Sequence, residues 1–301
     1  MKVVLIGGAG YIGRPLVQQL REKGIETISA DIRAGDGVDE AVDMRSAGEV
    51  YRLLLRGKPD VVVVTAYMLS RASAAEPLRA VETNVLGLTN VFQAAVDMGV
   101  RRVVFASSGA IFGNTEDFPL QPVDESVDCR PRILYAKMKR FNEWMAEHFN
   151  ESFGTEIVSY RISGPQGNRQ ASGGQSPYDK VVAAAGKRGR LTLPWTPHTL
   201  FRFIHIEDAA SSFIPIVLAA QLRHRIYNAP GYAVSIAELA ELARQIFNLE
   251  IEFAEPAQTI DFVARIDSTR YEREFEFRPR PMAEWMRKEL ETLPSVAPAG
   301  R

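Results

Sequence analysis

Hydrophobic residues near the start of the chain form short uninterrupted runs that are separated by longer segments with helical spacing. The runs at 2–7, 26–31 and 60–66 are typical of strands buried on both faces. A helix is predicted over 13–23, between the first two strands. This alternation predicts an α/β fold built on a parallel sheet that is covered by helices.

The same alternation continues through the middle of the chain. Apolar residues repeat at helical spacing over 74–98, and Gly99 is positioned to end that helix. A strand is predicted at 101–108, and a further helix begins after Pro131. The strand predicted at 156–162 extends the parallel sheet.

The alternation of strands and helices stops at residues 163–199, which are rich in glycine, proline and polar residues. This composition indicates an irregular excursion over a cleft. Order resumes at 201–208 and continues into an apolar helix. Farther on, helices are predicted at 235–248 and 281–291, with a strand at 250–254.

These patterns divide the chain into two parts. Residues 1–162, joined by 200–220, are predicted to form the larger domain with the doubly wound sheet. Residues 163–199 and 221–301 are predicted to form a smaller α/β lobe that binds the substrate.

Composition narrows the classes of partner. A chain of 301 residues with 46% hydrophobic residues can bury a large core, and its net charge of -1 attracts neither nucleic acid nor an anionic membrane. The single cysteine, Cys129, suits a reducing cytosol, and the short apolar start is neither a signal peptide nor a membrane span. We therefore expect a cytoplasmic protein that binds small molecules, without a metal site.

Three glycines follow the first strand. Gly7, Gly10 and Gly13 stand at spacing G-x-x-G-x-x-G where the strand gives way to a helix. Glycine allows a tight turn and lets backbone N–H groups approach a pyrophosphate, while the helix N-terminus adds partial positive charge. The turn predicts a dinucleotide site in a Rossmann-type domain.

An acidic residue closes the second strand. Asp31 lies 18 residues beyond Gly13, where a carboxylate accepts hydrogen bonds from the adenosine ribose and repels a 2′-phosphate. NAD is therefore favoured over NADP, although Arg33 weakens that preference by neutralising Asp31. A carboxylate that only caps a helix is the structural alternative.

The helix after Pro131 carries a tyrosine and a lysine four positions apart. In ILYAKMKRFNEW, residues 133–144, Tyr135 and Lys139 share one helical face. An ammonium group near a phenol favours the phenolate form. Because such pairs also occur on ordinary surfaces, the meaning of this one depends on its surroundings.

Taken together, these motifs resemble the extended short-chain dehydrogenase/reductase family of NAD-dependent epimerases and dehydratases. The resemblance includes the glycine turn, Asp31, ETNVLGLTNV, FASSGAIFG, YAKMK, YRISGPQG, FIHIEDAA and YNAPGYAVSIAELAE. It runs over most of the chain.

The resemblance implies a catalytic set of Ser108, Tyr135 and Lys139, with Ser107 as the second choice for the serine. Lys139 would bind the nicotinamide ribose and, with the positive ring of the cofactor, lower the pKa of Tyr135 toward neutrality. Tyr135 would then accept the alcohol proton while hydride leaves the same carbon, and Ser108 would hold the substrate oxygen.

The resemblance also implies which residues line the NAD site. Asp43 would contact the adenine, and Asn84 would lie close by. The full set expected around the cofactor is Gly7, Gly10, Tyr11, Ile12, Gly13, Asp31, Ile32, Asp43, Met44, Thr65, Ala66, Tyr67, Asn84, Tyr135, Lys139 and Arg161.

Departures from the family pattern bear on the reaction. Dehydratases carry an Asp-Glu pair where this chain has Gly109 and Ala110, so dehydration is set aside. Nucleotide-sugar epimerases place a diphosphate-binding arginine where this chain has Phe201, with Arg202 one position later as an alternative.

A second such arginine is not evident before Asp261. Besides Ser108 and Phe201, the substrate site is expected to include Asn168, Arg169 and His205. The departures favour a substrate smaller than a nucleotide sugar.

Three hypotheses follow. The first is a dehydrogenase that oxidises a secondary alcohol of a sugar-like or small polyhydroxy molecule. The second is a nucleotide-sugar epimerase that keeps its NAD, and the third is a dinucleotide sensor without turnover. The family also implies a homodimer formed by the helices that carry Asn84 and Tyr135.

Overall fold

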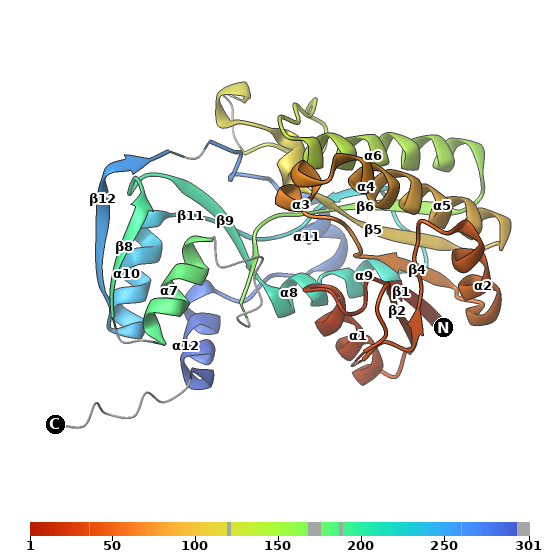
Figure 1. The fold of residues 1–301 in the computed structure, drawn as a ribbon, viewed down its shortest axis with the longest axis horizontal. Helices are drawn as coiled ribbons and strands as arrows, with labels where there is room; N and C mark the ends of the chain where they lie inside the picture. The colour runs from red at the N-terminus through yellow and green to blue at the C-terminus, as the bar shows by residue number, and fades with distance from the viewer. Residues whose placement is uncertain (36, 119–121, 168–175, 187–188, 260, 294–301) are drawn as a thin grey trace.

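A parallel sheet forms the centre of the larger lobe. The computed structural model describes residues 1–293 except 36, 119–121, 168–175, 187–188 and 260 (Figure 1). Within these residues the sheet has seven strands, each parallel to its neighbours. In spatial order they are β10 (Ile226–Asn228), β6 (Glu156–Ile162), β5 (Arg102–Ser108), β4 (Val61–Val64), β1 (Lys2–Ile6), β2 (Glu26–Asp31) and β3 (Glu40–Ala41).

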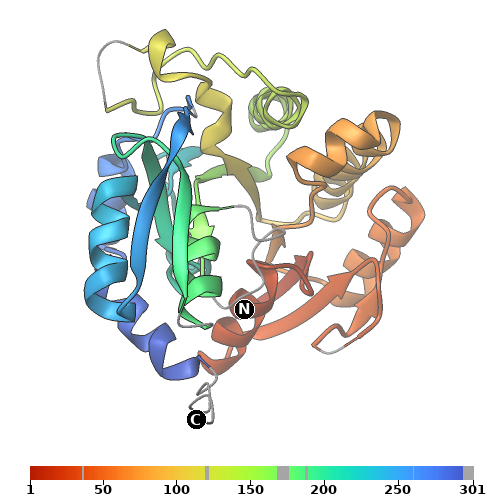
Figure 2. The ribbon, with the colours of Figure 1, turned by 60° about the vertical axis from the view of Figure 1, so that its left-hand side comes forward.

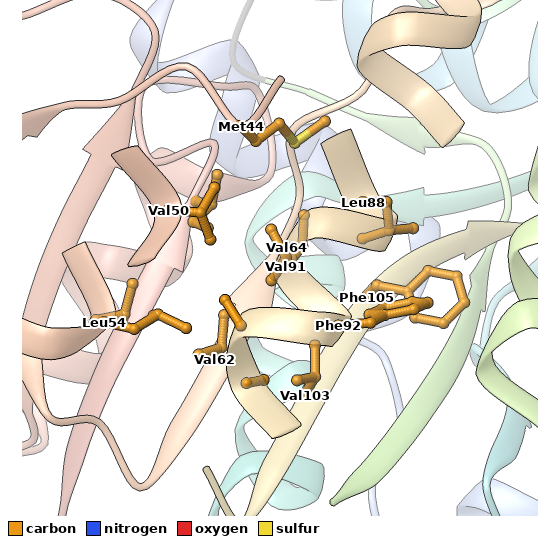
Figure 3. Packing of buried hydrophobic residues seen from close by; sticks show 14 of the residues in the cluster. Met44, Val50, Leu54, Val62, Val64, Leu88, Val91, Phe92, Val103 and Phe105 are labelled. Carbon is orange, nitrogen blue, oxygen red and sulfur yellow. The ribbon is translucent and has the colours of Figure 1, made fainter. Parts of the chain in front are cut away.

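Helices cover both faces of this sheet, as the continuous apolar runs predict. Val62 and Val64 of β4 pack with one group of helices, and Val61 and Val63 pack with the other. The first group comprises α2 (Ala47–Gly57), α5 (Leu88–Asp97) and α6 (Leu134–Ser152). The second comprises α1 (Gly13–Glu22), α8 (Ile206–Ser211), α9 (Phe213–Leu218) and α11 (Thr269–Phe275). Figure 3 shows Val50 and Leu54 of α2 facing Val62, with Val91 and Phe92 of α5 beside them.

A smaller lobe lies beside the larger one, at the left of Figure 1 and in green and blue in Figure 2. Its core includes Trp195, Phe203 and Trp285. Its strands are β7 (Pro165–Gln166), β9 (Leu200–His205) and β11 (Tyr232–Ser235) in one sheet, and β8 (Arg190–Trp195) and β12 (Glu250–Gln258) in another. Its helices are α7 (Pro177–Ala185), α10 (Ile236–Phe247) and α12 (Met282–Thr292). The predicted fold class, a doubly wound sheet with a smaller α/β lobe, is therefore confirmed.

The segment 163–199 is more regular than its composition suggests. The sequence predicts an excursion, whereas the described residues there form β7, α7 and β8. Tyr178, Val181 and Val182 bury one helical face against the smaller core, and so do Leu193 and Trp195 on alternate strand positions. Burial of these few apolar residues outweighs the many glycines and prolines around them.

The helix predicted over 74–98 is interrupted. It consists of α3 (Ser70–Ala75), α4 (Pro77–Val81), one π-helical segment η1 (Glu82–Gly87) and α5. Pro77 has no backbone N–H and begins a new helix. The π-helical segment shifts the backbone register around Asn84, and such segments often occur at functional sites.

The strand β10 lies at the edge of the larger sheet and pairs with β6. Residues 226–228 therefore belong to the larger sheet, although the sequence assigns 221–301 to the smaller lobe. Tyr227 packs in the same core as Tyr160 and Tyr271. The remaining boundaries of the two domains stay a prediction.

Candidate active site

The predicted catalytic and cofactor-binding residues gather at the carboxyl edge of the larger sheet. Gly7 follows β1, Asp31 ends β2, and Thr65 follows β4. Ser108 is the last residue of β5, and Tyr135 lies in the first turn of α6. Ligands of open α/β sheets bind at this edge, where the strand order reverses beside β1.

The glycine turn is too crowded for side chains. A Cβ atom on Gly13 would lie 1.9 Å from the carbonyl oxygen of Gly7, and one on Gly7 would lie 2.3 Å from the nitrogen of Ala66. Gly7 also has a φ of 99°, in the left-handed region. The turn therefore requires glycine at both positions, and its backbone stays accessible to a close ligand.

The neighbours of the turn are fixed by short hydrogen bonds. Thr65 Oγ1 donates to the Gly7 oxygen at 3.1 Å, and the N–H groups of Thr65 and Ala66 donate to the oxygen of Ile6. Asp31 accepts the N–H of Ala9 at 3.1 Å through Oδ2. Its other oxygen accepts the N–H of the exposed Ile32 at 2.8 Å. The carboxylate of Asp31 thus lies against the glycine turn.

Asp43 and Met44 lie in the segment after β3. Arg45 donates to both carboxylate oxygens of Asp43 at 2.9 and 3.0 Å, and this hydrogen bonding holds the pKa of Asp43 below its usual value. The Met44 side chain is buried in the core beside Gly87. Its carbonyl oxygen accepts from Asn90 at 3.0 Å, so both the backbone and the side chain of Met44 are engaged within the protein.

Two adjacent serines have different partners. Ser107 Oγ donates to Glu143 Oε1 at 2.6 Å and is committed to that buried carboxylate. Ser108 Oγ accepts the N–H of Ala110 at 3.2 Å, and the Ser108 hydroxyl acts to lower the pKa of Tyr135. The geometry therefore favours Ser108 over Ser107 as the partner of the phenol.

Lys139 is buried in the site. Its Nζ donates to the carbonyl oxygen of Ala106 and lies 3.2 Å from the centroid of the Tyr67 ring. The same nitrogen is 5.7 Å from the centroid of the Tyr135 ring. Burial lowers the pKa of Lys139 well below its usual value, and the charge of Glu143 acts in the opposite direction.

Glu143 forms a buried ion pair two turns beyond Tyr135. Arg161 donates to both of its oxygens, at 2.9 Å from Nε and at 2.8 Å from Nη2. Arg140 is a third partner at 3.0 Å. Nη1 of Arg161 is buried and has no partner among the described residues. Arg161, predicted to bind the cofactor, thus directs Nε and Nη2 toward Glu143 of α6.

Asn84 organises the loop after β4. Its side chain accepts the N–H of Met68 at 2.7 Å and donates to the Met68 oxygen at 3.0 Å. Its own backbone oxygen accepts from Asn142 at 2.8 Å. The segment that carries Tyr67 is therefore tied to η1 and α6.

Tyr11 and Ile12 are at the start of α1. The Tyr11 hydroxyl donates to the carbonyl oxygen of Gly167 at 2.6 Å, which joins the glycine turn to the segment after β7. Ile12 packs against the core between the sheet and α1. Of the two, only Tyr11 bridges the lobes.

The residues expected to bind substrate have apolar or already paired surroundings. The ring centroid of Phe201 lies 5.6 Å from that of Trp195 and 5.2 Å from that of Phe262. Arg202 is 5% exposed and donates to the oxygens of Ile266 and Ala229, each at 2.9 Å. Arg202 therefore does not take over the role of the missing diphosphate-binding arginine.

His205 is also internal. Its Nδ1 lies 2.9 Å from Nη2 of Arg280, and its ring centroid is 5.3 Å from that of Trp285. Asp261 accepts the N–H of Thr115 at 2.8 Å. The predicted substrate residues Asn168 and Arg169 lie outside the described residues. His205 thus ends β9, and its ring packs against Trp285 of α12.

Comparison with known proteins identifies the family. The sequence model described as "NAD dependent epimerase/dehydratase family" matches residues 3–229. The chain belongs to this family. The resemblance predicted from the motifs is confirmed, and the chain is an NAD-dependent enzyme.

Relatives in the family include enzymes with different reactions. UDP-glucose 4-epimerase of Streptococcus mutans is 28% identical over 174 residues, which are 54% of this chain and 51% of that enzyme. The chain thus spans about half the length of that relative. Mitochondrial L-threonine 3-dehydrogenase of Sus scrofa is 26% identical over 268 residues, 84% of this chain and 70% of that enzyme.

A solved structure shows the same fold. The X-ray structure of L-threonine dehydrogenase from Clostridium difficile matches with a TM-score of 0.85 at 22% identity. The match covers 97% of this chain and 98% of that one. In the described residues of the present chain, no helix combines the length and the apolar character needed to cross a membrane.

The described residues fit the NAD of the family. The turn at Gly7 and Gly13 has no room for side chains, Asp31 lies against it, and Nη1 of Arg161 is a buried donor without a partner. The role of each residue toward NAD stays a prediction. Of the predicted NAD-binding residues, those of the glycine turn are the best supported.

Two effects in the protein act on the phenol of Tyr135 in opposite directions. Burial raises the pKa of Tyr135, and the Ser108 hydroxyl only partly opposes this. A fall of this pKa toward neutrality stays a prediction, which the family resemblance assigns to Lys139 together with the positive nicotinamide ring.

The sequence analysis missed Glu143 and Asn142. Both lie on α6 close to Lys139, and both are buried polar side chains. Glu143 follows Lys139 by four positions, so it continues the line that begins at Tyr135. That spacing was the signal available in the sequence. The role of Glu143 becomes clear only from its contacts with Arg161 and Ser107 on neighbouring strands.

Proposed function

We propose that this member of the epimerase/dehydratase family is an NAD-dependent dehydrogenase that oxidises a secondary alcohol of a small sugar-like or polyhydroxy substrate. The observation that carries the choice is the environment of Phe201. An aromatic cluster stands where nucleotide-sugar epimerases are expected to hold a diphosphate, and the adjacent Arg202 is buried and paired to carbonyl oxygens. Among the described residues beside Phe201, a diphosphate would lose hydration without gaining Arg202 as a cation.

The proposed roles follow from the arrangement at the end of β5. Ser108 holds the substrate hydroxyl, Tyr135 accepts its proton, and Lys139 keeps positive charge beside the phenol. NAD, when bound, accepts the hydride from the same carbon. Glu143 and Arg161 hold α6 so that the phenol and the ammonium keep their positions.

The experiment is a turnover assay with purified protein. NAD is supplied with a panel of sugars, sugar acids, small polyols and L-threonine, and NADH is followed by absorbance. We expect NADH to accumulate with at least one small substrate and not with the Tyr135→Phe variant. A protein that leaves the whole panel unoxidised would contradict the proposal.

The alternative is a nucleotide-sugar epimerase that retains NAD. It is favoured by the 28% identity to the Streptococcus mutans UDP-glucose 4-epimerase. Interconversion of UDP-glucose and UDP-galactose without net NADH would support the epimerase and exclude the dehydrogenase. The same preparation decides between the two.

Exposed apolar side chains on neighbouring helices support a homodimer. Leu78 of α4 and Leu86 of η1 are 74% and 50% exposed, and Phe141 and Trp144 of α6 are 41% and 54% exposed. A second copy of the same surface would bury them as a four-helix contact. We also place the enzyme in the cytoplasm, since its single cysteine suits a reducing compartment.

A further inference from the structure

Tyr67 contacts both Tyr135 and Lys139, the two side chains on which the proposed chemistry depends. Its ring packs edge-on against Tyr135, with centroids 5.4 Å apart and planes at 87°. The face of the same ring lies 3.2 Å from Nζ of Lys139. Lys139 is closer to this ring than to that of Tyr135, at 5.7 Å. One residue therefore contacts both the proposed base and its cation.

The ammonium group has few other partners. Lys139 is 2% exposed, so its N–H donors have little access to water. The group of β5 that faces Lys139 is the Ala106 carbonyl, which accepts one of the three ammonium donors. An aromatic face attracts a desolvated cation strongly because the ring quadrupole replaces part of the lost hydration.

The Tyr67 ring is itself held from two sides. Asn142 Nδ2 donates to the Tyr67 hydroxyl at 3.3 Å and to the Asn84 oxygen at 2.8 Å, which uses both of its donors. Asn84 binds the N–H and the carbonyl of the next residue, Met68. Both amides are buried. The hydroxyl end of Tyr67 and the backbone of the residue after it are therefore both held by buried amides.

We infer that Tyr67 is a positioning residue whose ring keeps the Lys139 ammonium charged and in place beside Tyr135. The inference rests on the proposed function, in which Tyr135 is the base. Without the ring, the buried amine would favour its neutral form, and the positive charge next to Tyr135 would be lost. The phenol would then release its proton only at higher pH.

The remaining charged groups around Lys139 do not replace the ring. Glu143 on the same helix favours the charged form of Lys139, but Arg161 from β6 and Arg140 neutralise that carboxylate. On the side of β5, Ser108 and the Ala106 carbonyl are uncharged. Burial raises the pKa of Tyr67, so its hydroxyl stays protonated while Lys139 titrates.

The test compares variants that keep or remove the ring. Tyr67→Phe keeps the ring face and loses only the hydroxyl bond to Asn142, whereas Tyr67→Leu and Tyr67→Met remove the face. Ionisation of Tyr135 is followed by phenolate absorbance with NAD present, after subtraction of the same protein carrying Tyr135→Phe. The pH dependence of kcat/KM is measured in parallel.

We expect the midpoint of Tyr135 ionisation to rise by about one pH unit in the two variants without a ring. The acidic limb of kcat/KM should move in the same direction, so that activity lost at neutral pH returns at higher pH. Tyr67→Phe should stay close to the wild type in both measurements. Two variants without the ring are used so that the test can still be made if one of them fails to fold.

Several results would overturn the inference. One is a folded variant without the Tyr67 ring in which NAD affinity falls but the pH midpoint of Tyr135 ionisation does not change. Tyr67 would then only line the cofactor. Another is an equal shift in Tyr67→Phe. The absorbance titration needs no substrate, so a wild type without dehydrogenase activity would refute the proposed function and still leave Tyr67 tested.

Discussion

Tyr135 is a half-buried phenol close to the Ser108 hydroxyl and the Lys139 ammonium group, and these surroundings predict the effect of removing its oxygen. In Tyr135→Phe the ring keeps its edge contact with Tyr67 but cannot accept a proton. We expect kcat to fall by about 10²- to 10⁴-fold, as for loss of a general base. NAD affinity, measured by fluorescence titration, should change less than about threefold.

A matched Tyr51→Phe variant is the control, since it removes a phenol hydroxyl that donates to Asp97 at the surface between α2 and α5. Its kcat should stay within about tenfold of the wild type. If Tyr135→Phe turned over as fast as Tyr51→Phe, Tyr135 could not be the base.

The glycine turn gives a second prediction at this scale. In Gly13→Ala the new methyl group would lie 1.9 Å from the Gly7 oxygen and 2.8 Å from its carbonyl carbon, so the turn must open. We expect a loss of about 1–3 kcal/mol of stability and at least about a tenfold loss of NAD affinity. Calorimetric titration and urea unfolding measure the two effects.

Gly154→Ala is the control because an added Cβ there meets no atom within 4 Å. It should leave NAD affinity unchanged. Equal NAD affinity in Gly13→Ala and Gly154→Ala would show that the turn does not cradle the cofactor.

At the scale of elements, α6 depends on one buried ion pair. Glu143→Ala removes the partner of both Arg161 and Ser107 and leaves a guanidinium group that is 2% exposed without its counter-charge. Breaking a buried pair from one side costs about 3–5 kcal/mol. We expect a loss of this size in the free energy of unfolding, measured with urea.

Glu147→Ala is the control on the same helix, one turn later and exposed. Its effect should stay within about 0.5 kcal/mol. A loss below about 1 kcal/mol in Glu143→Ala would mean that α6 is held in place mainly by apolar packing.

Sequence reasoning succeeded where one local pattern decides the structure and failed where distant partners do. The strand of β4 and the helix of α6 follow from their own apolar spacing. The π-helical segment Glu82–Gly87 does not, because the Asn84 oxygen within it accepts its hydrogen bond from Asn142 on another helix. Residues 163–199 were misjudged because their apolar residues matter only against α10 and α12.

The candidate site shows the same limit. Tyr135, Lys139 and the glycine turn were predictable from spacing and resemblance, because each lies within one short segment. The burial of Arg202 and the position of Tyr67 over Lys139 were not, since each depends on contacts between residues more than 25 positions apart.

At the scale of the whole molecule, Arg280 joins the segment before α12 to the start of α8. Its side chain donates to Asp208 at 2.8 Å and to Glu207 at 3.0 Å. Burial raises the pKa of Glu207, but the Arg280 bond and nearby positive charges outweigh it, so the net pKa lies below its usual value. The resulting stabilisation is complete above the pKa of about 4.3 that Glu207 has in the unfolded chain. It is lost as the pH falls through the lower pKa that Glu207 has in the folded protein.

Arg280→Met should therefore destabilise the protein more at pH about 7 than at pH about 3, because protonation of Glu207 weakens its bond with Arg280 as the pH falls. Urea midpoints at the two pH values measure the difference. Arg287→Met, which changes an exposed arginine of α12, should shift the midpoint little at either pH. A penalty from Arg280→Met that is equal at both pH values would contradict the assignment of the bond to Glu207.

The proposed homodimer makes the last prediction, because exposed apolar side chains need a partner surface only if they lie inside an interface. Phe141→Lys with Trp144→Lys places two charges on the exposed side of α6, where they would meet their own copies across a twofold contact. Buried like charges should convert a dimer into a monomer without unfolding it, since neither side chain belongs to a core cluster of the described residues. Sedimentation measures the mass, and thermal melting checks the fold. Leu55→Lys is the control, because Leu55 is 59% exposed but lies on α2, away from the proposed contact. A dimer that survives both lysines, or one that Leu55→Lys also dissociates, would place the contact elsewhere on the molecule.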